Sequence, residues 1–261
     1  MKYGFIGCGN MGGAIARSLS RSTTDIMVSD RSGKAKVLAH ELEISYGTPA
    51  EVARQCDRIF LGVKPQMMAD ALRPLQPILA EKKPVLISMA AGLHIDQILQ
   101  MAGISLPMIR IMPNTPVGVG KGVVLYCANE QVAPELLEDF LQDMQYCGIL
   151  DPVEEKLFDA AGTVSGCGPA YLYMLIEAMA DGAVACGVPR SKAISYAAAT
   201  MAGAAEMVLQ TGKHPGELKD AVCSPGGSTI AGVRVLEEKG FRSAAVECIV
   251  AACKRNRELG E

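Results

Sequence analysis

Three glycines near the N-terminus have the spacing of a turn that binds a dinucleotide. Gly7, Gly9 and Gly12 follow a short apolar segment, residues 3–6, and precede an alanine-rich segment that begins at Ala14. A strand that enters such a turn and continues as a helix directs free backbone N–H groups at a pyrophosphate. Because strand and helix patterns flank the glycines, the motif predicts a nicotinamide dinucleotide site. The residues predicted to bind the cofactor here are Gly7, Cys8, Gly9, Asn10, Met11 and Gly12.

The identity of that dinucleotide depends on the residues at the end of the second predicted strand, residues 26–30. Asp30 stands where a carboxylate bonds the ribose hydroxyls of NAD. Arg31 comes next, followed by Ser32, Lys34 and Lys36, a cluster that can hold the 2′-phosphate of NADP or can simply be a solvated turn. Asp30 would repel that phosphate unless its carboxylate turned away. These residues alone leave NAD and NADP equally open, and we predict that both Asp30 and Arg31 bind the cofactor.

Three further turns follow predicted strands and contain residues suited to a cofactor cleft. In an open parallel sheet, ligands bind beyond the carboxyl ends of the strands, so these turns converge on one edge. Small side chains in residues 90–92 leave room for a flat ring, and an asparagine between two prolines can bond a carboxamide. Each turn taken singly is ordinary strand-end chemistry. The residues predicted here are Val63, Lys64, Pro65, Ala90, Ala91, Gly92 and Asn114.

A second glycine-containing turn lies far along the chain, in residues 224–229, Ser-Pro-Gly-Gly-Ser-Thr. The two glycines bring bare backbone N–H groups to the start of a predicted helix, and we expect the following serine or threonine to cap it. This arrangement predicts a cradle for a carboxylate or a phosphate, with an ordinary helix–helix turn as the alternative. The residues predicted to form the cradle are Gly226, Gly227, Ser228 and Thr229.

Two regions of different character must position these turns. Over residues 1–151, strand and helix patterns alternate, which indicates an α/β fold with a Rossmann-type, doubly wound sheet. After residue 151 no strand pattern appears, and Pro169 and Pro189 each open a helix that a glycine ends. We therefore predict a dinucleotide-binding domain at 1–151 and an all-helical substrate-binding and dimerisation domain at 152–261. The predicted strands are 3–6, 26–30, 59–63, 84–88, 108–112 and 122–126, and one helix is expected over 67–79.

The helical domain is predicted to associate with a second copy of the chain. Residues 197–205 are nearly all small, so this helix is apolar most of the way round. Such a helix needs more cover than one small domain provides. A symmetric dimer supplies that cover, and a monomeric helical bundle is the alternative.

Composition argues against several other classes of protein. The 261 residues are 49% apolar and 20% charged, and the net charge of −3 contains no block of like charge, so we expect neither a nucleic-acid nor a membrane partner. The most apolar stretch, 171–188, carries Glu177 and Asp181, which argues against a membrane span. Because the first residues lead directly into a strand, a signal peptide is not expected, and a cytoplasmic location is.

The metal-binding residue types are sparse and scattered. Nine cysteines and three histidines show no ligand spacing, so no metal site is predicted. An odd number of cysteines on apolar segments indicates buried free thiols in a reducing compartment. Cys8, inside the glycine turn, is expected to pack rather than to react.

Taken together, these segments closely resemble those of the pyrroline-5-carboxylate reductase family. The resemblance covers the full length of the chain. It includes the opening Gly-Phe-Ile-Gly-Cys-Gly-Asn-Met-Gly, residues 63–65, 110–116 and 165–171, and the run Leu-Lys-Asp-Ala-Val-Cys-Ser-Pro-Gly-Gly-Ser-Thr that ends at Thr229. The last run is highly specific to that family, whereas the first is shared with the related hydroxyacid dehydrogenases.

The resemblance implies hydride transfer from a nicotinamide cofactor to the C=N bond of 1-pyrroline-5-carboxylate, a small-molecule substrate, giving L-proline in the last step of its biosynthesis. It implies NADPH as the commoner donor and NADH as a second one. It implies that backbone N–H groups of residues 226–229 hold the substrate carboxylate and that the hydroxyl of Thr229, the catalytic residue, lies beside the ring nitrogen. It also implies a homodimer through the helical domain, assembled into a larger homo-oligomer. Where some members carry an asparagine near the adenine, this chain has Thr48 and Pro49, which leaves the adenine contacts open.

Two other functions share part of this pattern. A hydroxyacid dehydrogenase removes a proton from an alcohol and usually needs a lysine in the first helix of its second domain, whereas residues 162–171 contain none. A non-catalytic cofactor sensor would keep the glycine turn but would not need the second cradle. A cyclic imine is readily protonated, so its reduction needs positioning rather than a strong acid. That requirement agrees with site segments that contain no histidine or carboxylate pair.

Overall fold

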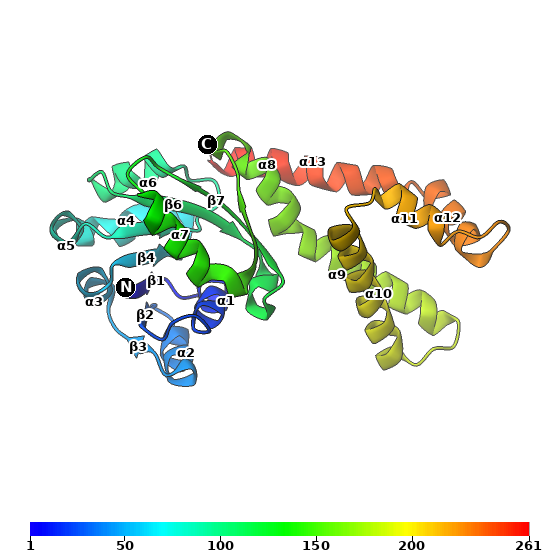
Figure 1. Cartoon of the computed structure of the whole chain (residues 1–261), viewed down its shortest axis with the longest axis horizontal. Helices are drawn as coiled ribbons and strands as arrows, with labels where there is room; N and C mark the ends of the chain where they lie inside the picture. The colour runs from blue at the N-terminus through cyan, green and yellow to red at the C-terminus, as the bar shows by residue number, and fades with distance from the viewer. Residues whose placement is uncertain (261) are drawn as a thin grey trace. The chain divides into compact units, whose positions relative to one another are not determined.

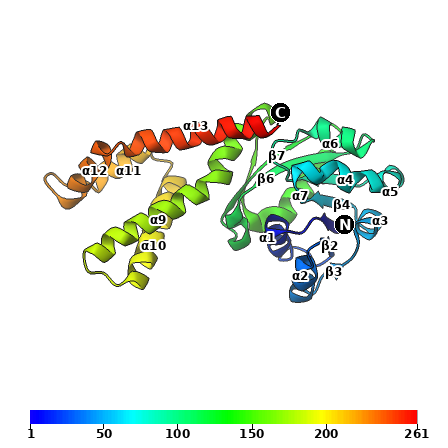
Figure 2. The same cartoon turned by 180° about the vertical axis from the view of Figure 1, so that it is seen from behind.

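The computed structural model describes residues 1–260 and divides into two compact units (Figure 1, Figure 2). The first unit is formed by Met1–Cys167 together with the segment from Ala252 onward, and the second by Gly168–Ala251. Glu261, the last residue of the predicted helical domain, lies outside the described residues.

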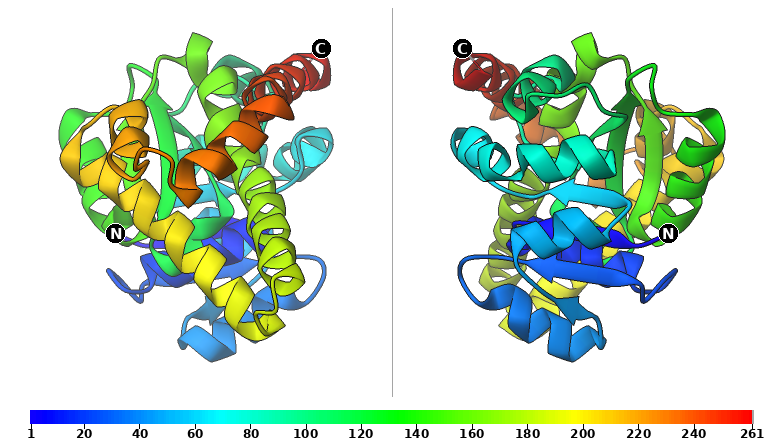
Figure 3. Two further views of the ribbon diagram at one scale, coloured as in Figure 1. Left: turned by 90° about the vertical axis from the view of Figure 1, so that its right-hand side faces the viewer. Right: turned by 90° about the vertical axis from the view of Figure 1, so that its left-hand side faces the viewer.

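The first unit is built on a sheet of eight strands. They are β1 (Tyr3–Ile6), β2 (Ile26–Ser29), β3 (Ser45–Tyr46), β4 (Arg58–Leu61), β5 (Val85–Ser88), β6 (Met108–Pro113), β7 (Gly122–Ala128) and β8 (Gly148–Pro152). Their order is β3-β2-β1-β4-β5-β6-β7-β8, and the strands run from blue to green across the unit in the right-hand view of Figure 3. The direction of winding reverses at β1, which lies between β2 and β4. In a doubly wound sheet, ligands bind beyond the strand ends at this point.

Helices cover both faces of this sheet. They are α1 (Asn10–Leu19), α2 (Lys34–Leu42), α3 (Pro49–Gln55), α4 (Met68–Leu72), α5 (Gln76–Lys82), α6 (Ile95–Ala102), α7 (Pro134–Asp143) and α8 (Phe158–Gly162). Successive residues of β1 point to opposite faces, so Phe5 packs in one apolar core with α1, α2 and α7. Ile6 belongs to the other core, with α3, α4, α5 and α6. The buried strands are therefore mostly apolar, with a few buried polar residues such as Arg58 and Arg110, which is why their positions could be predicted.

The predicted α/β class is confirmed, and the six expected strands end within two residues of their expected positions. Two strands at the far edge differ from the prediction. β7 runs antiparallel to β6, because only the short 3-10 turn Thr115–Val119 connects them, where a parallel strand would need a crossover helix. β8, which was not predicted, pairs in parallel with β7 and has only half-buried and exposed residues, so it lacks an apolar pattern.

The single helix expected over 67–79 is also wrong. A 3-10 turn, Arg73–Leu75, separates α4 from α5. Pro74 and Pro77 fall in and just after this turn, and a proline has no N–H to donate to a helical carbonyl. The chain therefore bends there while keeping the apolar side chains of both helices against the sheet.

A buried guanidinium closes the end of the sheet at which its parallel strands begin. Arg58 in β4 is 1% exposed and donates to the hydroxyl of Tyr3 at 2.5 Å and to Oδ2 of Asp143 at 3.2 Å. Tyr3 in turn donates to the same oxygen at 2.6 Å, and burial raises the pKa of Tyr3, so its hydroxyl remains protonated. These three residues join β1, β4 and α7 at the end opposite the glycine turn.

A second buried arginine fastens the chain after β8 to the sheet. Arg110 in β6 is fully buried and donates to Oε1 of Glu155 at 3.2 Å and to Oδ1 of Asp159 at 3.1 Å. Its guanidinium also lies over the ring of Phe158, 4.5 Å from the centroid. The segment that contains α8 is therefore held on the first unit by two ion pairs and a ring contact.

These contacts bear on the domain boundary. The predicted end of the α/β region, residue 151, lies within β8, which ends at Pro152. The compact unit nevertheless continues through α8 and the following π-helical turn, Thr163–Cys167, because the buried arginine holds that segment. The assignment of dinucleotide binding to residues 1–151, and of substrate binding and dimerisation to residues 152–261, stays a prediction.

In the second unit, every regular element is a helix. They are α9 (Gly168–Ala185), α10 (Arg190–Thr211), α11 (Pro215–Ala221), α12 (Ser228–Glu238) and the larger part of α13 (Phe241–Gly260). α9 and α10 pack against each other, and Pro189 and Gly212 cap α10 at its two ends, as predicted. Many large apolar side chains stay exposed on this unit, among them Tyr173, Met174, Ile194, Tyr196, Met207, Leu209, Val246 and Val250. An apolar surface of this extent is typical of a protein interface.

Candidate cofactor and substrate sites

The turn after β1 has the geometry that its glycines predict. Gly7 has a φ of 90°, which side chains rarely tolerate, and a Cβ there would lie 2.8 Å from the backbone of Gly62. A Cβ on Gly12 would lie 3.0 Å from the carbonyl oxygen of Gly7, so α1 packs directly on the turn. A Cβ on Gly9 would meet nothing within 4 Å, which leaves this stretch of backbone open to a ligand.

The backbone N–H groups of this turn fall into two sets. Those of Gly7 and Cys8 donate to the carbonyl of Ser29 at 2.9 and 3.0 Å, so they hold the turn to β2 rather than face a ligand. Gly9 is the N-cap of α1 and accepts its first internal hydrogen bond at 2.8 Å. The helix has no acidic residue in its first turn, so its start suits an anion. The N–H groups without a helical acceptor are those of Asn10, Met11 and Gly12.

Cys8 is a packing residue, as predicted. Its side chain is 2% exposed and belongs to the apolar core that includes α1. Burial, followed by the charge of Asp30, raises the pKa of the Cys8 thiol to about 12, although Arg17 opposes the shift. A thiol with this pKa is protonated at neutral pH and is a poor nucleophile.

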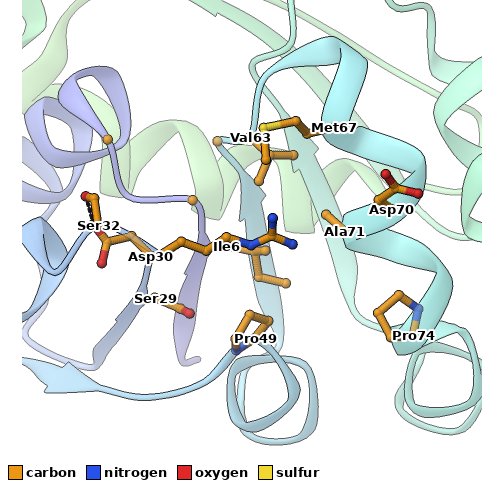
Figure 4. A pocket seen from close by; sticks show the side chains of 14 residues that line it. Ile6, Ser29, Asp30, Ser32, Pro49, Val63, Met67, Asp70, Ala71 and Pro74 are labelled. Atoms are coloured by element: carbon orange, nitrogen blue, oxygen red, sulfur yellow. Dashed lines mark hydrogen bonds between the residues drawn. The ribbon is translucent and has the colours of Figure 1, made fainter.

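A cavity of about 290 Å³ opens beside the glycine turn (Figure 4). Five of the predicted cofactor residues line it: Gly7, Gly9, Asp30, Arg31 and Val63. Other lining residues were not predicted, because no local pattern marks them: Met67, Asp70, Ala71 and Pro74. Pro49 also lines the cavity, whereas Thr48 caps α3 through its Oγ1, which accepts from the N–H of Glu51 at 3.2 Å. The apolar lining suits a flat heteroaromatic ring such as adenine.

The carboxylate of Asp30, at the tip of β2, is bound by its own loop. Oδ2 accepts from the Ser32 hydroxyl at 2.6 Å, the bond that is dashed in Figure 4, and Oδ1 accepts from the N–H of Gly33 at 3.0 Å. Burial opposes ionisation, but the Ser32 bond and the backbone N–H groups of Ala35, Gly33 and Lys34 outweigh it and lower the pKa of Asp30. The start of α2 thus already holds this anion.

The predicted cofactor residues that follow β4 and β5 lie at the same edge of the sheet, because these two strands pair in parallel. Lys64 and Pro65 begin a short 3-10 turn directly after Val63. Residues 90–92 form an open turn, in which the N–H of Ala90 donates to the Ser88 hydroxyl at 3.2 Å. Lys64, Pro65 and residues 90–92 do not line the cavity beside Asp30, so they suit the other end of an extended dinucleotide.

Asn114, at the end of β6, has both ends of its amide engaged. Its Oδ1 accepts from the N–H of Val123 at 2.9 Å, and its Nδ2 donates to the carbonyl of Ser165 at 2.9 Å. The residue is 7% exposed. Its amide therefore ties β6 to β7 and to the π-helical turn, and a bond to a nicotinamide carboxamide would have to compete with these contacts.

The second glycine turn has a different hydrogen-bond pattern from the one predicted. Pro225 and Gly226 occupy its two central positions, Gly226 has a φ of 68°, and the N–H of Gly227 donates to the carbonyl of Ser224 at 3.0 Å. A type II turn has proline and glycine at these positions. The N–H of Gly227 therefore belongs to the turn and is not bare.

The start of α12 is nevertheless open to an anion. Gly227, rather than Ser228 or Thr229, is the N-cap, and no side chain caps the helix, because the serine and threonine are its first two residues. The first turn contains no acidic residue, and both hydroxyl residues are exposed. The N–H groups without a helical acceptor are those of Ser228, Thr229 and Ile230, the last of which was not predicted.

Other kinds of site find little support in the described residues. Over residues 1–260, no group of three or more His, Cys, Asp or Glu side chains is placed to hold a metal ion. The helices of this part of the chain include none that is long and apolar enough to cross a membrane. All nine cysteines are free thiols.

Comparison with known proteins covers both parts of the chain. Residues 155–259 match a family described as pyrroline-5-carboxylate reductase dimerisation, and residues 2–92 match one described as NADP oxidoreductase, coenzyme F420-dependent. The chain is 41% identical to the pyrroline-5-carboxylate reductase of Escherichia coli, over 100% of this chain and 98% of that protein. It is 42% identical to the one from Glycine max, over 98% and 95%. The chain belongs to the pyrroline-5-carboxylate reductase family.

Solved structures of pyrroline-5-carboxylate reductases share its fold. The Plasmodium falciparum enzyme, which has NADP bound, gives a TM-score of 0.89 at 31% identity and covers 100% of this chain and 98% of its own. The Coxiella burnetii enzyme gives 0.89 at 30% identity, with the same coverage. A ketol-acid reductoisomerase, at 17% identity and a TM-score of 0.65, shares the fold alone. The match of residues 155–259 to the dimerisation family assigns self-association to the helical part of the chain.

Proposed function

We propose that this protein reduces the C=N bond of 1-pyrroline-5-carboxylate to give L-proline, the last step of proline biosynthesis. NADPH is the preferred donor and NADH a second one. The observation that carries the proposal is the 41% identity to a pyrroline-5-carboxylate reductase over 100% of this chain. The two open helix starts of α1 and α12 support it, because the cofactor and the substrate each carry an anionic group.

The residues of the first unit fit a dinucleotide. The pyrophosphate would lie at the start of α1, and the adenosine would lie in the cavity, against Pro49 and beside Arg31, which would take the 2′-phosphate. The nicotinamide would lie toward Lys64, Pro65 and residues 90–92, with Asn114 keeping the end of β6 in place. When bound, the reduced cofactor supplies the hydride.

The start of α12 would hold the substrate carboxylate through the N–H groups of Ser228, Thr229 and Ile230. Gly226 and Gly227 would shape the turn that presents these groups. A five-membered ring whose carboxylate is fixed in this way brings its nitrogen within reach of the threonine hydroxyl. In this arrangement Thr229 touches the substrate at the reacting C=N bond.

The protein's contribution to the reaction is positioning. A protonated cyclic imine accepts hydride at carbon without help from a strong acid, so the site must fix the ring and the donor at contact distance. The iminium N–H would donate to Oγ1 of Thr229, which keeps the proton on nitrogen while the carbon is reduced. This role explains why the residues assigned to the substrate and the nicotinamide are mainly glycines, alanines and hydroxyl residues rather than a histidine or a carboxylate pair.

We further propose a homodimer formed through the helical part, dimers that assemble into a larger homo-oligomer, and a cytoplasmic location. The exposed apolar side chains of α9 and α10 support the association, since a partner would remove them from water. The nine free thiols support a reducing compartment.

The proposal is tested by following NADPH absorbance with pyrroline-5-carboxylate as substrate and NADH in a parallel assay. Thr229→Ala should lower kcat/KM for the imine about 10- to 100-fold, the effect of losing a hydrogen bond to a charged group, and should leave NADPH affinity unchanged. Thr229→Ser keeps the hydroxyl and should stay within about threefold of the native enzyme.

Two results would contradict the proposal at different levels. An unchanged kcat/KM in Thr229→Ala would remove the role of the hydroxyl but leave the reaction standing. Cofactor binding by the native protein without any imine-dependent oxidation of NADPH or NADH would remove the reaction itself. It would favour a hydroxyacid dehydrogenase or a cofactor sensor.

A further inference from the structure

Both oxygens of the Asp30 carboxylate accept hydrogen bonds from the loop that follows β2. Oδ2 accepts from the Ser32 hydroxyl and Oδ1 accepts from the N–H of Gly33, and the backbone N–H groups at the start of α2 help these two bonds to lower the pKa of Asp30. All of these donors belong to the loop and the first turn of α2. An acidic residue at this position in an NAD-binding site instead accepts from the ribose hydroxyls.

Ser32 has a single proton to donate, and that proton is committed. Its hydroxyl donates to Oδ2 of Asp30 at 2.6 Å, so it cannot also donate to a phosphate without releasing the carboxylate. Arg31, next to it in the chain, is exposed and lines the cavity. Ser32 thus holds the Asp30 side chain, whereas Arg31 remains available to an anion.

We infer that Ser32 sets the cofactor preference of this protein by holding the Asp30 carboxylate against the start of α2. This inference rests on the proposed position of the adenosine at the tip of β2. With the carboxylate held, its negative charge is partly balanced by the donors of its own loop while Arg31 binds a 2′-phosphate, which favours NADPH. With the carboxylate released, its oxygens face the cavity, where they repel a phosphate and accept from the ribose hydroxyls of NADH.

The test measures binding rather than turnover. The dissociation constants of NADPH and NADH are determined in the absence of imine, from the fluorescence of the reduced nicotinamide. In Ser32→Ala, the ratio of the NADH constant to the NADPH constant should fall about tenfold, with weaker NADPH binding and tighter NADH binding. Ser32→Thr keeps the hydroxyl and should keep the native ratio. Ser20→Ala is the matched control, because the Ser20 hydroxyl bonds only the carbonyl of Arg17, at 2.9 Å, in the last turn of α1.

A second background separates an indirect role of Ser32 from a direct one. In Asp30→Asn there is no carboxylate charge to hold. Adding Ser32→Ala to this variant should therefore change the ratio of the NADH to the NADPH dissociation constant less than about twofold. Ser32→Ala could instead weaken NADPH binding by the same factor in the native protein and in Asp30→Asn. The Ser32 hydroxyl would then contact the phosphate itself, and the inference would be overturned.

The single variant Asp30→Asn tests independently whether the carboxylate binds the ribose. It should leave NADH affinity within about twofold of the native value, because the carboxylate does not bind the ribose. A loss of NADH affinity of about tenfold or more would show that it does, and would overturn the inference. Failure of the native protein to bind either dinucleotide would instead overturn the proposed cofactor site on which the inference rests.

Discussion

At the scale of single residues, burial decides which ionisable groups of the core exchange protons. Cys8, Cys56 and Cys147 are 2%, 0% and 0% exposed. Burial raises the pKa of Cys8 to about 12, and it raises the pKa values of Cys56 and Cys147 to about 11, from an ordinary value of 9.0. The folded chain therefore keeps three thiol protons in a range of pH where the unfolded chain loses them.

This difference predicts that stability falls in alkali. The thiol contribution is fully present below pH 9.0, the unfolded value, and is lost as the pH rises through the folded values of about 11 to about 12. Each thiol adds a slope of about −1.4 kcal/mol per pH unit within this interval. Urea unfolding at several values between about pH 8 and about pH 11 measures the slope.

Two cysteine variants provide the comparison. Cys147→Ala should make the slope shallower by one proton, whatever it does to the stability at neutral pH. Cys186→Ala removes an exposed thiol and is the control for the loss of a cysteine as such. Equal slopes for the two variants would mean that the buried thiol does not retain its proton.

At the scale of elements, the cofactor site depends on two turns that touch. A Cβ on Gly62, at the end of β4, would lie 2.1 Å from the carbonyl oxygen of Gly7. The carbonyl is backbone and cannot rotate away as a side chain would. The turn after β1 and the end of β4 can therefore keep their separation only while residue 62 has no side chain.

Gly62→Ala should push these two turns apart. We expect NADPH affinity to fall at least about tenfold and the free energy of unfolding to fall by about 1–3 kcal/mol, as in other overpacked sites. Gly13→Ala is the matched control, since its Cβ would lie 3.6 Å from Cδ2 of Leu38, an ordinary contact. It lies inside α1 and should raise stability by about 0.5–1 kcal/mol. Retained NADPH affinity in Gly62→Ala would show that the two turns do not act together.

At the scale of the whole molecule, the helical unit cannot be complete as a single copy. Met174 in α9 is 69% exposed and Leu209 in α10 is 64% exposed. Both helices have exposed apolar side chains together with small residues, which permits close approach of another helix. The sheet unit, in contrast, contains two continuous buried apolar cores.

Association should therefore be sensitive to charge on the helical unit alone. The double variant Met174→Glu, Leu209→Glu should weaken self-association by about 100-fold or more, because two carboxylates would be taken out of water, as sedimentation velocity can measure. Val119→Glu, at a position of the sheet unit that is 78% exposed, should leave association unchanged. NADPH binding should survive in both variants. A native protein that sediments as a monomer would contradict the prediction.

What the sequence could predict depended on how local the determining contacts are. The turn at Gly7 follows from backbone requirements within a few residues, and it was predicted. A turn at Gly226 was also expected, but its type II hydrogen bond from Gly227 to Ser224 was not. The two hydrogen-bond partners of the Asn114 amide lie 9 and 51 residues away along the chain, so no local sequence pattern indicates that this side chain is already hydrogen-bonded. Met67 and Ala71 line the cavity although no motif marks them in the sequence. The edge strand β8 was missed because its residues are not buried.

The segment from Ala252 onward belongs to the same compact unit as the glycine turn. Asn256 donates to the hydroxyl of Thr163 at 3.1 Å and so joins the end of the chain to the π-helical turn that Asn114 also holds. On the ribosome, β1 to β4 are available early, because they lie within the first 61 residues. Their unit gains the segment from Ala252 onward only after the whole helical unit, Gly168–Ala251, has been translated. A truncated chain would thus lose support for its N-terminal unit before it lost any of the helices between.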